Sequence, residues 1–291
     1  GSLTPLGDPP LFLGFLKGVD FFWTTSAMFL PMVFMIVSLL IIFYFLDSYY
    51  LKKENINTNP SAEKIKLGVE GVFNIGLILG VIGAVLISGF WKPHISFEIY
   101  HGVHLELQNI ARDLLLLGLT YASWTYTPQQ IRKDNEYTWF PIVEVAKLFA
   151  GIFITIIPAI AILKAGTNGA LAFIISSVSS ESGPINMMYF WYTGVLSSFL
   201  DNAPTYLVFF NTAGGDPITL MGQMKETLLA ISMGAVFMGA NTYIGNAPNF
   251  MVKSISESSG IEMPSFFGYL FKWSIPFLVP LFVIVSWIYF G

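Results

Sequence analysis

Long apolar runs are the feature that most limits how this chain can fold. Residues 26–46 contain 21 residues and no charged side chain, and residues 71–91 form a second run of this kind. A helix needs about 20 mostly apolar residues to cross the hydrocarbon layer of a membrane. Only 11% of the 291 residues are charged, whereas soluble domains usually have about 25%. We therefore expect an integral membrane protein.

Charge and residue usage exclude several classes of function. The net charge is −4 and no basic patch is present, which excludes nucleic acid as a partner. The chain has no cysteine, so it has neither disulfides nor thiolate ligands. No nucleophile–base triad, phosphate-binding loop or zinc motif is visible. We therefore expect neither an enzyme nor a resident cofactor.

Four further segments complete the expected spans of an all-α polytopic fold. They are residues 114–131 (beginning near 107), 141–163, 227–252 and 273–291. The third of these contains Asn241, Asn246 and Pro248, which predict a discontinuous helix. Residues 165–180 are too short for a span and lead into turn-forming residues.

A further apolar segment, residues 185–211, has Asp201-Asn202-Ala203-Pro204 at its middle. A carboxylate, an amide and a proline together stop a helix. Two interpretations remain open: a loop between two buried helices, or a re-entrant hairpin near residues 185–212 with its tip at 201–204. We favour the hairpin. Non-helical backbone survives at membrane depth only where protein or a wet cavity surrounds it.

An internal repeat organises the chain. Residues 1–10 and 239–248 share the pattern G-x-x-T-x-x-G-[DN]-x-P at a constant offset of 238. The same offset moves residues 26–46 onto 264–284, within the region of the last span. A motif and its following span therefore repeat together, as in transporters with one discontinuous helix in each half.

The repeat divides the chain into two parts. Residues 1–67 are expected to be the end of a first repeat, with the motif, one span and a cytoplasmic loop. Residues 68–291 are expected to be a second repeat of five spans plus the hairpin. If the 47–70 loop is cytoplasmic, more Lys and Arg residues fall in inner than in outer loops. The repeats are then inverted, and about 170 residues of the first repeat are expected upstream.

Three polar breaks, at residues 4–10, 201–205 and 241–249, are expected to converge at the membrane midplane. Broken helices leave carbonyl and N–H groups free, and carbonyl, Asn and Thr oxygens can replace the hydration shell of sodium. The glycines of the motif let the backbone turn tightly. The candidate ion- or substrate-binding residues are Asp201, Asn202, Thr205, Asn241, Thr242, Gly245, Asn246, Thr4, Gly7 and Asp8, with Na⁺ itself at Asp201, Asn202, Asn241 and Thr242.

Asp201 is the most informative candidate, because no other charge lies between residues 182 and 215. A carboxylate at membrane depth is costly and indicates function. Burial favours the protonated form of a carboxyl group and a bound cation favours the ionised form, so one carboxylate can hold H⁺ or Na⁺. The alternative is a helix-capping aspartate, and Asp8 has the similar alternative of a turn before two prolines. Glu144 and Lys147 are expected to form a structural ion pair.

The segments 201–205 and 239–249 resemble motifs of the ion-transporter superfamily, and residues 3–10 resemble the first-half copy. This superfamily includes NhaD-type sodium/proton antiporters and citrate-transporter-like permeases. The resemblance implies inverted repeats with a re-entrant hairpin and a broken helix in each, and usually a homodimer. Anion symporters of this group have Ser-Asn-Thr at the hairpin tip. Asp201-Asn202-Ala203 here favours a cation, and the chain is most similar to the NhaD-like group.

The leading hypothesis is Na⁺(Li⁺)/H⁺ antiport by alternating access, with Asp201 as the shared Na⁺/H⁺ site. The alternative is a sodium-coupled permease for citrate, a dicarboxylate or another anion. A third hypothesis is a membrane scaffold that transports nothing. The expected partners are Na⁺ or Li⁺, H⁺, the lipid bilayer and a second copy, and the expected location is the bacterial inner (plasma) membrane.

Overall fold

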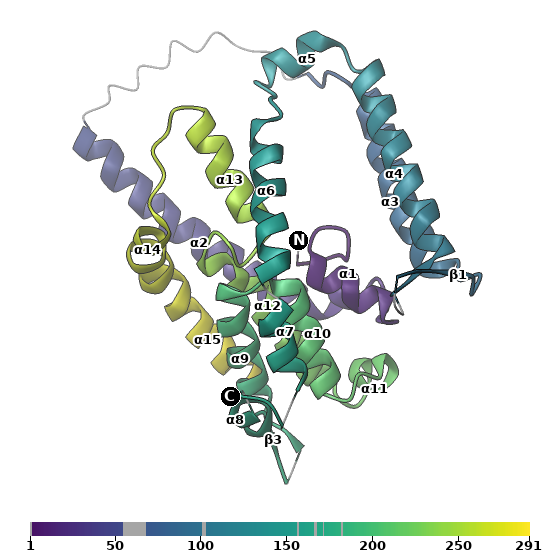
Figure 1. Cartoon of the computed structure of the whole chain (residues 1–291). Coiled ribbons are helices and arrows are strands. Elements are labelled where there is room, and N and C mark those ends of the chain that lie inside the picture. Colours follow the sequence, from purple (N-terminus) through teal and green to yellow (C-terminus); the bar gives the residue numbers. More distant parts are fainter. Residues whose placement is uncertain are drawn as a thin grey trace. The chain divides into compact units, whose positions relative to one another are not determined.

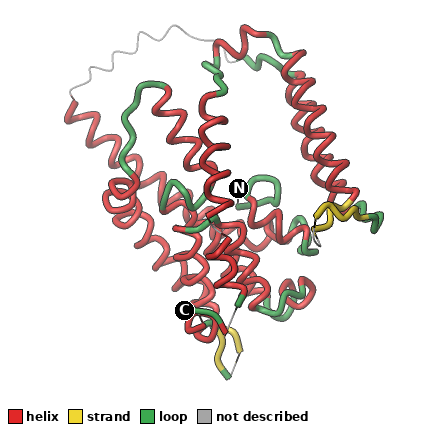
Figure 2. Tube along the Cα trace, in the orientation of Figure 1, coloured by secondary structure: helices red, strands yellow, loops and turns green. Residues whose placement is uncertain are grey.

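The computed structural model describes residues 2–54, 68–100, 103–155, 157–165, 168–170, 172–181 and 183–291. Most of these residues are helical, and the strands among them form two short hairpins (Figure 2). The chain divides into two compact units, Gly1–Asn55 with Trp139–Gly291, and Ile56–Thr138.

The first unit consists almost entirely of helices (Figure 1). Its first part contains α1 (Pro9–Leu16), α2 (Trp23–Glu54), α6 (Phe140–Thr155), α7 (Ile157–Lys164) and α8 (Ala172–Ser177). The strands β3 (Ser179–Ser180) and β4 (Gly183–Pro184) lead into α9 (Asn186–Phe199), α10 (Asn202–Thr212), α11 (Pro217–Met221) and α12 (Lys225–Met238). The last part contains the 3₁₀ helix η2 (Gly239–Asn241), α13 (Ala247–Ser258), α14 (Phe266–Tyr269), the π-helix η3 (Leu270–Leu278) and α15 (Val279–Phe290).

Three helices in the described part of the chain are long and apolar enough to cross a membrane. They are Trp23–Lys53, Phe73–Phe90 and Phe266–Phe290. At most 28% of their most apolar windows is buried within the protein, so most of these apolar side chains are available to lipid. These helices agree with the spans predicted at residues 26–46, 71–91 and 273–291.

One other predicted span ends earlier in the structure than expected, and a further one keeps its predicted bounds to within one residue at each end. The span expected to reach residue 131 ends at Tyr126, because Thr127 precedes Pro128 and a residue before proline avoids the helical region. The span expected at 141–163 comprises α6 and α7, with residue 156 outside the described part. Residues 165–180 contain the short helix α8 and the strand β3, which agrees with the prediction that this segment is too short for a span.

Close packing of α9 against α12 forms the centre of the first unit. A Cβ atom on Gly194 would lie 2.1 Å from Met238 Sδ, and one on Gly234 would lie 2.5 Å from the Phe190 carbonyl oxygen. Small residues let two helices approach closely, which is a common basis of helix association in membranes. Helix α10 packs against α9, α12 and α1, so the segments around all three predicted breaks belong to one packed group.

The last span contains a π-helical segment, η3, near its middle. The N–H of Val279 bonds to the carbonyl of Ser274, five residues earlier, as in a π-helix. Pro276 lies inside this segment and has no N–H of its own to donate. Wide helical turns of this kind are frequent at functional sites.

The second unit contains α3 (Phe73–Phe90), β1 (Ser96–Tyr100), β2 (Val103–Glu106), α4 (Leu107–Tyr126) and α5 (Gln129–Asp134). Helices α3 and α4 lie side by side (Figure 1). The side-chain oxygen of Asn74 on α3 accepts hydrogen bonds from the hydroxyls of Ser123 at 2.9 Å and Thr127 at 3.0 Å. The antiparallel pairing of β1 with β2 was not predicted.

The remaining predictions concern the loop before residue 70, the orientation of the repeats, the hairpin and one ion pair. The predicted 47–70 loop begins later than expected, because residues 47–54 continue α2. Residues 55–67, which lead to the predicted boundary at 67/68, lie outside the described residues. The inverted orientation of the repeats and the re-entrant hairpin also remain predictions. The ion pair predicted between Glu144 and Lys147 is confirmed at 3.0 Å. Both of its side chains are exposed, which agrees with a structural role.

Candidate functional site

The predicted span at 227–252 is interrupted, as its polar residues indicated. Helix α12 ends at Met238, η2 reaches Asn241, and α13 begins at Ala247. Asn246 is the N-cap residue of α13 and Pro248 lies in the first helical turn, where its missing N–H has no partner to lose. Residues 239–246 are called the C-terminal break.

A second interruption separates α9 from α10. Asp201 is the N-cap residue of α10 and is only 8% exposed. Its carboxylate accepts a hydrogen bond from the N–H of Ala203 at 3.3 Å, and its carbonyl oxygen accepts one from the Thr205 hydroxyl at 3.0 Å. The capping role foreseen as an alternative is therefore observed, and a capping carboxylate retains other lone pairs for an ion. Residues 201–205 are called the central break.

Ser198, on the last turn of α9 just before the central break, bonds to the C-terminal break. Its carbonyl oxygen accepts a hydrogen bond from the Thr242 hydroxyl. Its own hydroxyl accepts one from Asn241 Nδ2 at 2.9 Å and contacts the carbonyl oxygen of Met238 at 2.9 Å. Ser197 is equally buried and donates to the Ala235 carbonyl at 2.7 Å. The end of α9 is thus fixed to the end of α12.

Gly245 lies against main-chain carbonyl groups. A Cβ atom at this position would lie 2.6 Å from the carbonyl oxygen of Gly239, 2.8 Å from that of Ser197 and 3.1 Å from that of Ser198. Real Cβ atoms essentially never approach another atom closer than 3.0 Å. Glycine is therefore required here by the close approach of oxygen atoms, which gather partial negative charge from the ends of two helices.

Asp8 brings the N-terminal motif into contact with the central break. It precedes α1, is 4% exposed, and accepts a hydrogen bond from Asn202 Nδ2 at 3.0 Å. The same nitrogen of Asn202 lies 3.5 Å from the position that a Cβ on Gly239 would take. One buried amide therefore bonds to Asp8 in residues 3–8, which are called the N-terminal break, and lies beside Gly239 of the C-terminal break.

The two copies of the repeated motif have the same local structure. Asp8 (φ −146°, ψ 126°) and Asn246 (φ −154°, ψ 134°) are both extended N-cap residues whose side chains make no capping hydrogen bond, and each precedes a helix with a proline in its first turn. The N–H of Gly7 bonds to the Thr4 carbonyl, and the N–H of Gly245 bonds to the Thr242 hydroxyl. The sequence repeat is therefore also a structural repeat at the level of the break.

Two amide oxygens in the C-terminal break lack partners. Oδ1 of Asn241 and Oδ1 of Asn246 are buried and accept no hydrogen bond. A buried acceptor without a partner costs about 1–3 kcal/mol. Neither Asp8 nor Asp201 belongs to any of the ion pairs found among the described residues. The breaks therefore present buried oxygen atoms with unused capacity to accept.

Not every predicted residue reaches this cluster. Thr4 and Gly7 bond to each other through their main chains, and Gly7 is exposed. Within the described ranges, no group of three or more His, Asp or Glu side chains could hold a metal ion. Any cation at the breaks would therefore be held largely by amide, hydroxyl and carbonyl oxygens, as Na⁺ sites in broken helices are.

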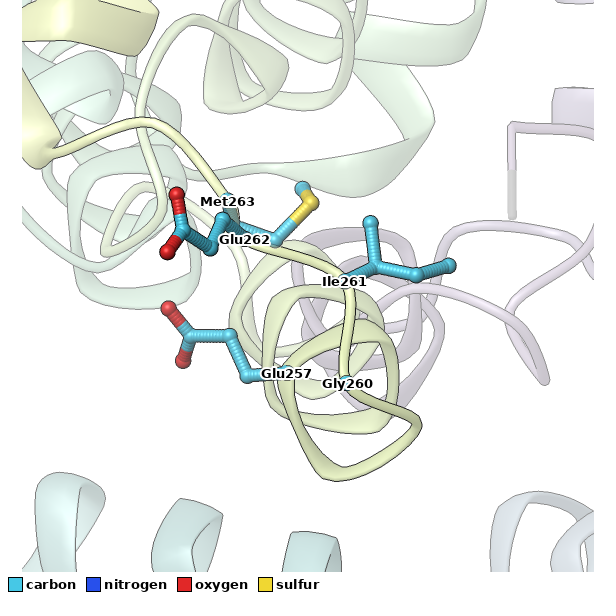
Figure 3. A pocket seen from close by; sticks show the side chains of 5 residues that line it. All are labelled: Glu257, Gly260, Ile261, Glu262 and Met263. Atoms are coloured by element: carbon cyan, nitrogen blue, oxygen red, sulfur yellow. The ribbon is translucent and has the colours of Figure 1, made fainter.

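A surface pocket of about 390 Å³ lies elsewhere, just after α13. Its lining residues are Glu257, Gly260, Ile261, Glu262 and Met263 (Figure 3). The Glu257 carboxylate pairs with Lys253 at 2.6 Å. None of the lining residues belongs to a break, so the pocket is separate from the oxygen cluster.

The serines that fix the end of α9 to the end of α12 and to the C-terminal break were not predicted from the sequence. Ser197 and Ser198 are adjacent hydroxyl residues one turn before Asp201, and this pattern in an apolar helix was the available signal. Asn249 fell within a predicted break, but its role was not foreseen: Nδ2 bonds to the carbonyls of Gly239 and Thr242, each at 3.0 Å.

Helices long and apolar enough to cross a membrane, combined with buried polar helix breaks, are typical of integral membrane transporters. The chain matches the family model described as "Putative citrate transport" over residues 1–290, and it belongs to that family. No curated protein and no solved structure matches the chain. The family supports a transporter rather than an enzyme, whereas the transported ion or solute is a separate question.

Proposed function

We propose that this chain forms the ion site of a secondary transporter that exchanges Na⁺ or Li⁺ for H⁺. The observation that carries the proposal is the buried oxygen cluster, in which Asn241 Oδ1 and Asn246 Oδ1 lack hydrogen-bond partners. Buried oxygens that accept nothing from the protein are available to a ligand that supplies a hydrogen-bond donor or a positive charge. Sodium is such a ligand, since amide, hydroxyl and carbonyl oxygens replace its hydration shell.

Asp201 supplies the exchangeable charge in this proposal. Its carboxylate is buried and caps α10 through one hydrogen bond. A proton or a sodium ion can neutralise it, and each excludes the other by charge. Asn202 and Thr205 place further oxygens beside it. Asp8 contributes a second carboxylate from the N-terminal break through its bond to Asn202.

Alternating access would move this site between the two sides of the membrane. The repeated break at Asp8 and Asn246 supports two structurally equivalent halves, and such halves rock against each other around a central site in many transporters. Inverted orientation of the halves, a homodimer and the bacterial inner membrane are parts of this proposal.

Sodium-coupled uptake of citrate or another carboxylate is the second candidate. The family description favours it, and so does the start of α13, whose N-cap residue Asn246 makes no capping bond. Free N–H groups at a helix N-terminus attract anions. The carboxylates of Asp8 and Asp201 argue against it, because they repel an anionic substrate unless cations bind first.

Everted membrane vesicles that contain the protein separate these candidates. After a proton gradient is established, added Na⁺ should collapse it with the wild type and fail to do so with Asp201→Asn. Asp216→Asn is the matched control, because Asp216 is also an N-cap aspartate but is solvent-exposed. Antiport is wrong if Na⁺ leaves the gradient intact or if Asp201→Asn equals the wild type. Uptake of labelled citrate that requires Na⁺ would instead establish the second candidate.

A further inference from the structure

A hydroxyl group from the following span holds one main-chain carbonyl in each repeated break. In the C-terminal break, the Ser274 hydroxyl donates to the carbonyl oxygen of Asn241 at 2.7 Å. In the N-terminal break, the hydroxyls of Thr24 and Thr25 donate to the carbonyl oxygen of Leu3 at 3.1 and 2.6 Å. Leu3 and Asn241 are separated by the repeat offset of 238. The carbonyl that accepts the hydrogen bond therefore lies at the same motif position in both halves, whereas the donors occupy different positions in the two following spans.

The contact of Ser274 differs from the contact that most hydroxyls make in apolar helices. Ser and Thr side chains usually bond to a carbonyl three or four residues earlier in their own helix, as Ser286 does with Val283 at 3.0 Å. Ser274 lies in the same last span but reaches 33 residues back along the chain. The Ser274 side chain is fully buried and Asn241 is also buried, so this hydrogen bond is shielded from water.

The contact bears directly on the side chain of Asn241. Ser274 holds the main-chain oxygen of this residue, and Ser198 holds Nδ2 of its side chain. With two of its polar groups fixed, Asn241 keeps Oδ1 buried and free of any hydrogen bond. The Tyr269 hydroxyl also bonds to the neighbouring carbonyl of Ala240 at 3.1 Å, so the last span holds the break at two successive residues.

The π-helix places Ser274 for this role. Ser274 lies within η3, at the carbonyl that accepts from Val279 five residues later. A π-helix has more residues per turn than an α-helix, so it alters the direction of the side chains that follow its start. Segment η3 contacts η2, the start of the C-terminal break. The irregular turn and the hydroxyl contact therefore occur at the same place in the last span.

We propose that Ser274 is a positioning residue of the ion site, and that Thr24 and Thr25 of α2 hold the equivalent carbonyl of the N-terminal break. Each hydroxyl fixes its break to the span that follows, and Ser274 thereby directs Asn241 Oδ1 toward the bound cation. This inference rests on the proposed Na⁺ site. It adds residues that lie outside the breaks and act only through the residues they hold.

The test compares Na⁺-dependent gradient collapse for Ser274→Ala, Ser274→Thr and the control Ser286→Ala. Losing the net contribution of one hydrogen bond corresponds to about a 2–10-fold change in a binding constant. We expect Ser274→Ala to raise the apparent KM for Na⁺ by about this factor and to leave kcat nearly unchanged. Ser274→Thr keeps the hydroxyl and should restore the KM, whereas Ser286→Ala should match the wild type.

The N-terminal contact offers an independent test. Because Thr24 and Thr25 share one carbonyl acceptor, either valine substitution alone should change the KM less than the double substitution does. The positioning role is overturned if Ser274→Ala keeps the wild-type KM. It is also overturned if Ser274→Ala and Ser286→Ala lower the thermal stability and kcat alike, since that pattern indicates general packing. A wild type without any Na⁺ response overturns the proposed function, and this inference with it.

Discussion

Replacement of Gly245 by alanine tests the geometry of the C-terminal break. The new Cβ atom would lie 2.6 Å from the Gly239 carbonyl oxygen and 2.8 Å from that of Ser197. Both neighbours are main-chain atoms, which cannot move aside as the end of a flexible side chain can. Either the break or the end of α9 must shift, and both carry atoms of the proposed ion site.

The expected magnitude follows from this overlap. Forcing one methyl group into a packed site costs about 1–3 kcal/mol, which lowers the melting temperature by about 2–12 °C for a chain of this size. Na⁺-dependent gradient collapse should weaken with it, because the carbonyl oxygens are displaced. Gly83→Ala is the matched control, since a Cβ atom at Gly83 on α3 meets nothing within 4 Å.

Thermal unfolding of the detergent-solubilised protein and the vesicle assay together decide this prediction. Gly83→Ala should unfold at the wild-type temperature or slightly above it, because alanine favours a helix over glycine. If Gly245→Ala unfolds like Gly83→Ala and transports like the wild type, the carbonyl oxygens do not surround Gly245 and the reasoning is refuted.

Two further variants test neighbouring features. Asn202→Ala removes the hydrogen bond to the buried Asp8 and should destabilise the protein by about 1–3 kcal/mol in thermal unfolding. Asn211→Ala at the exposed end of α10 is the control, and an equal loss there would contradict the inferred contact. Hydrogen bonds from Thr219 lower the pKa of Asp216 below its ordinary 3.8. The ionised carboxylate therefore stabilises the fold above pH 3.8, and this stabilisation is lost as the pH falls through the lowered pKa. Asp216→Asn should therefore lower the melting temperature at neutral pH, and the difference from the wild type should vanish in strong acid, whereas a difference independent of pH would exclude this cause.

The sequence predicted the features that depend on local composition. Apolar runs of about twenty residues located three membrane-crossing helices, because length and hydropathy alone determine such a helix. Asn246 and Pro248 located the break before α13, since both residue types disfavour a helix interior. The repeated motif located Asp8 at the start of α1, and the structure gives it the same backbone conformation as Asn246.

Features that depend on distant partners were not predicted. Ser198 and Ser274 resemble any small residue in an apolar helix, and their partners lie more than thirty residues away in the chain. The π-helix is also invisible in the sequence, because its apolar pattern is like that of an α-helix. The β1–β2 hairpin did have a local signal: Ile95, Phe97 and Ile99 alternate with polar residues, as in a strand with one apolar face.

Proton release on sodium binding shows whether Na⁺ and H⁺ share the Asp201 carboxylate. When Na⁺ is added to the purified protein in weakly buffered solution, protons should be released, because Na⁺ displaces the proton held by Asp201. Asp216→Asn should release protons like the wild type, and Asp201→Asn should release none. Sodium binding without proton release in the wild type, or an undiminished release from Asp201→Asn, would contradict a shared Na⁺/H⁺ site.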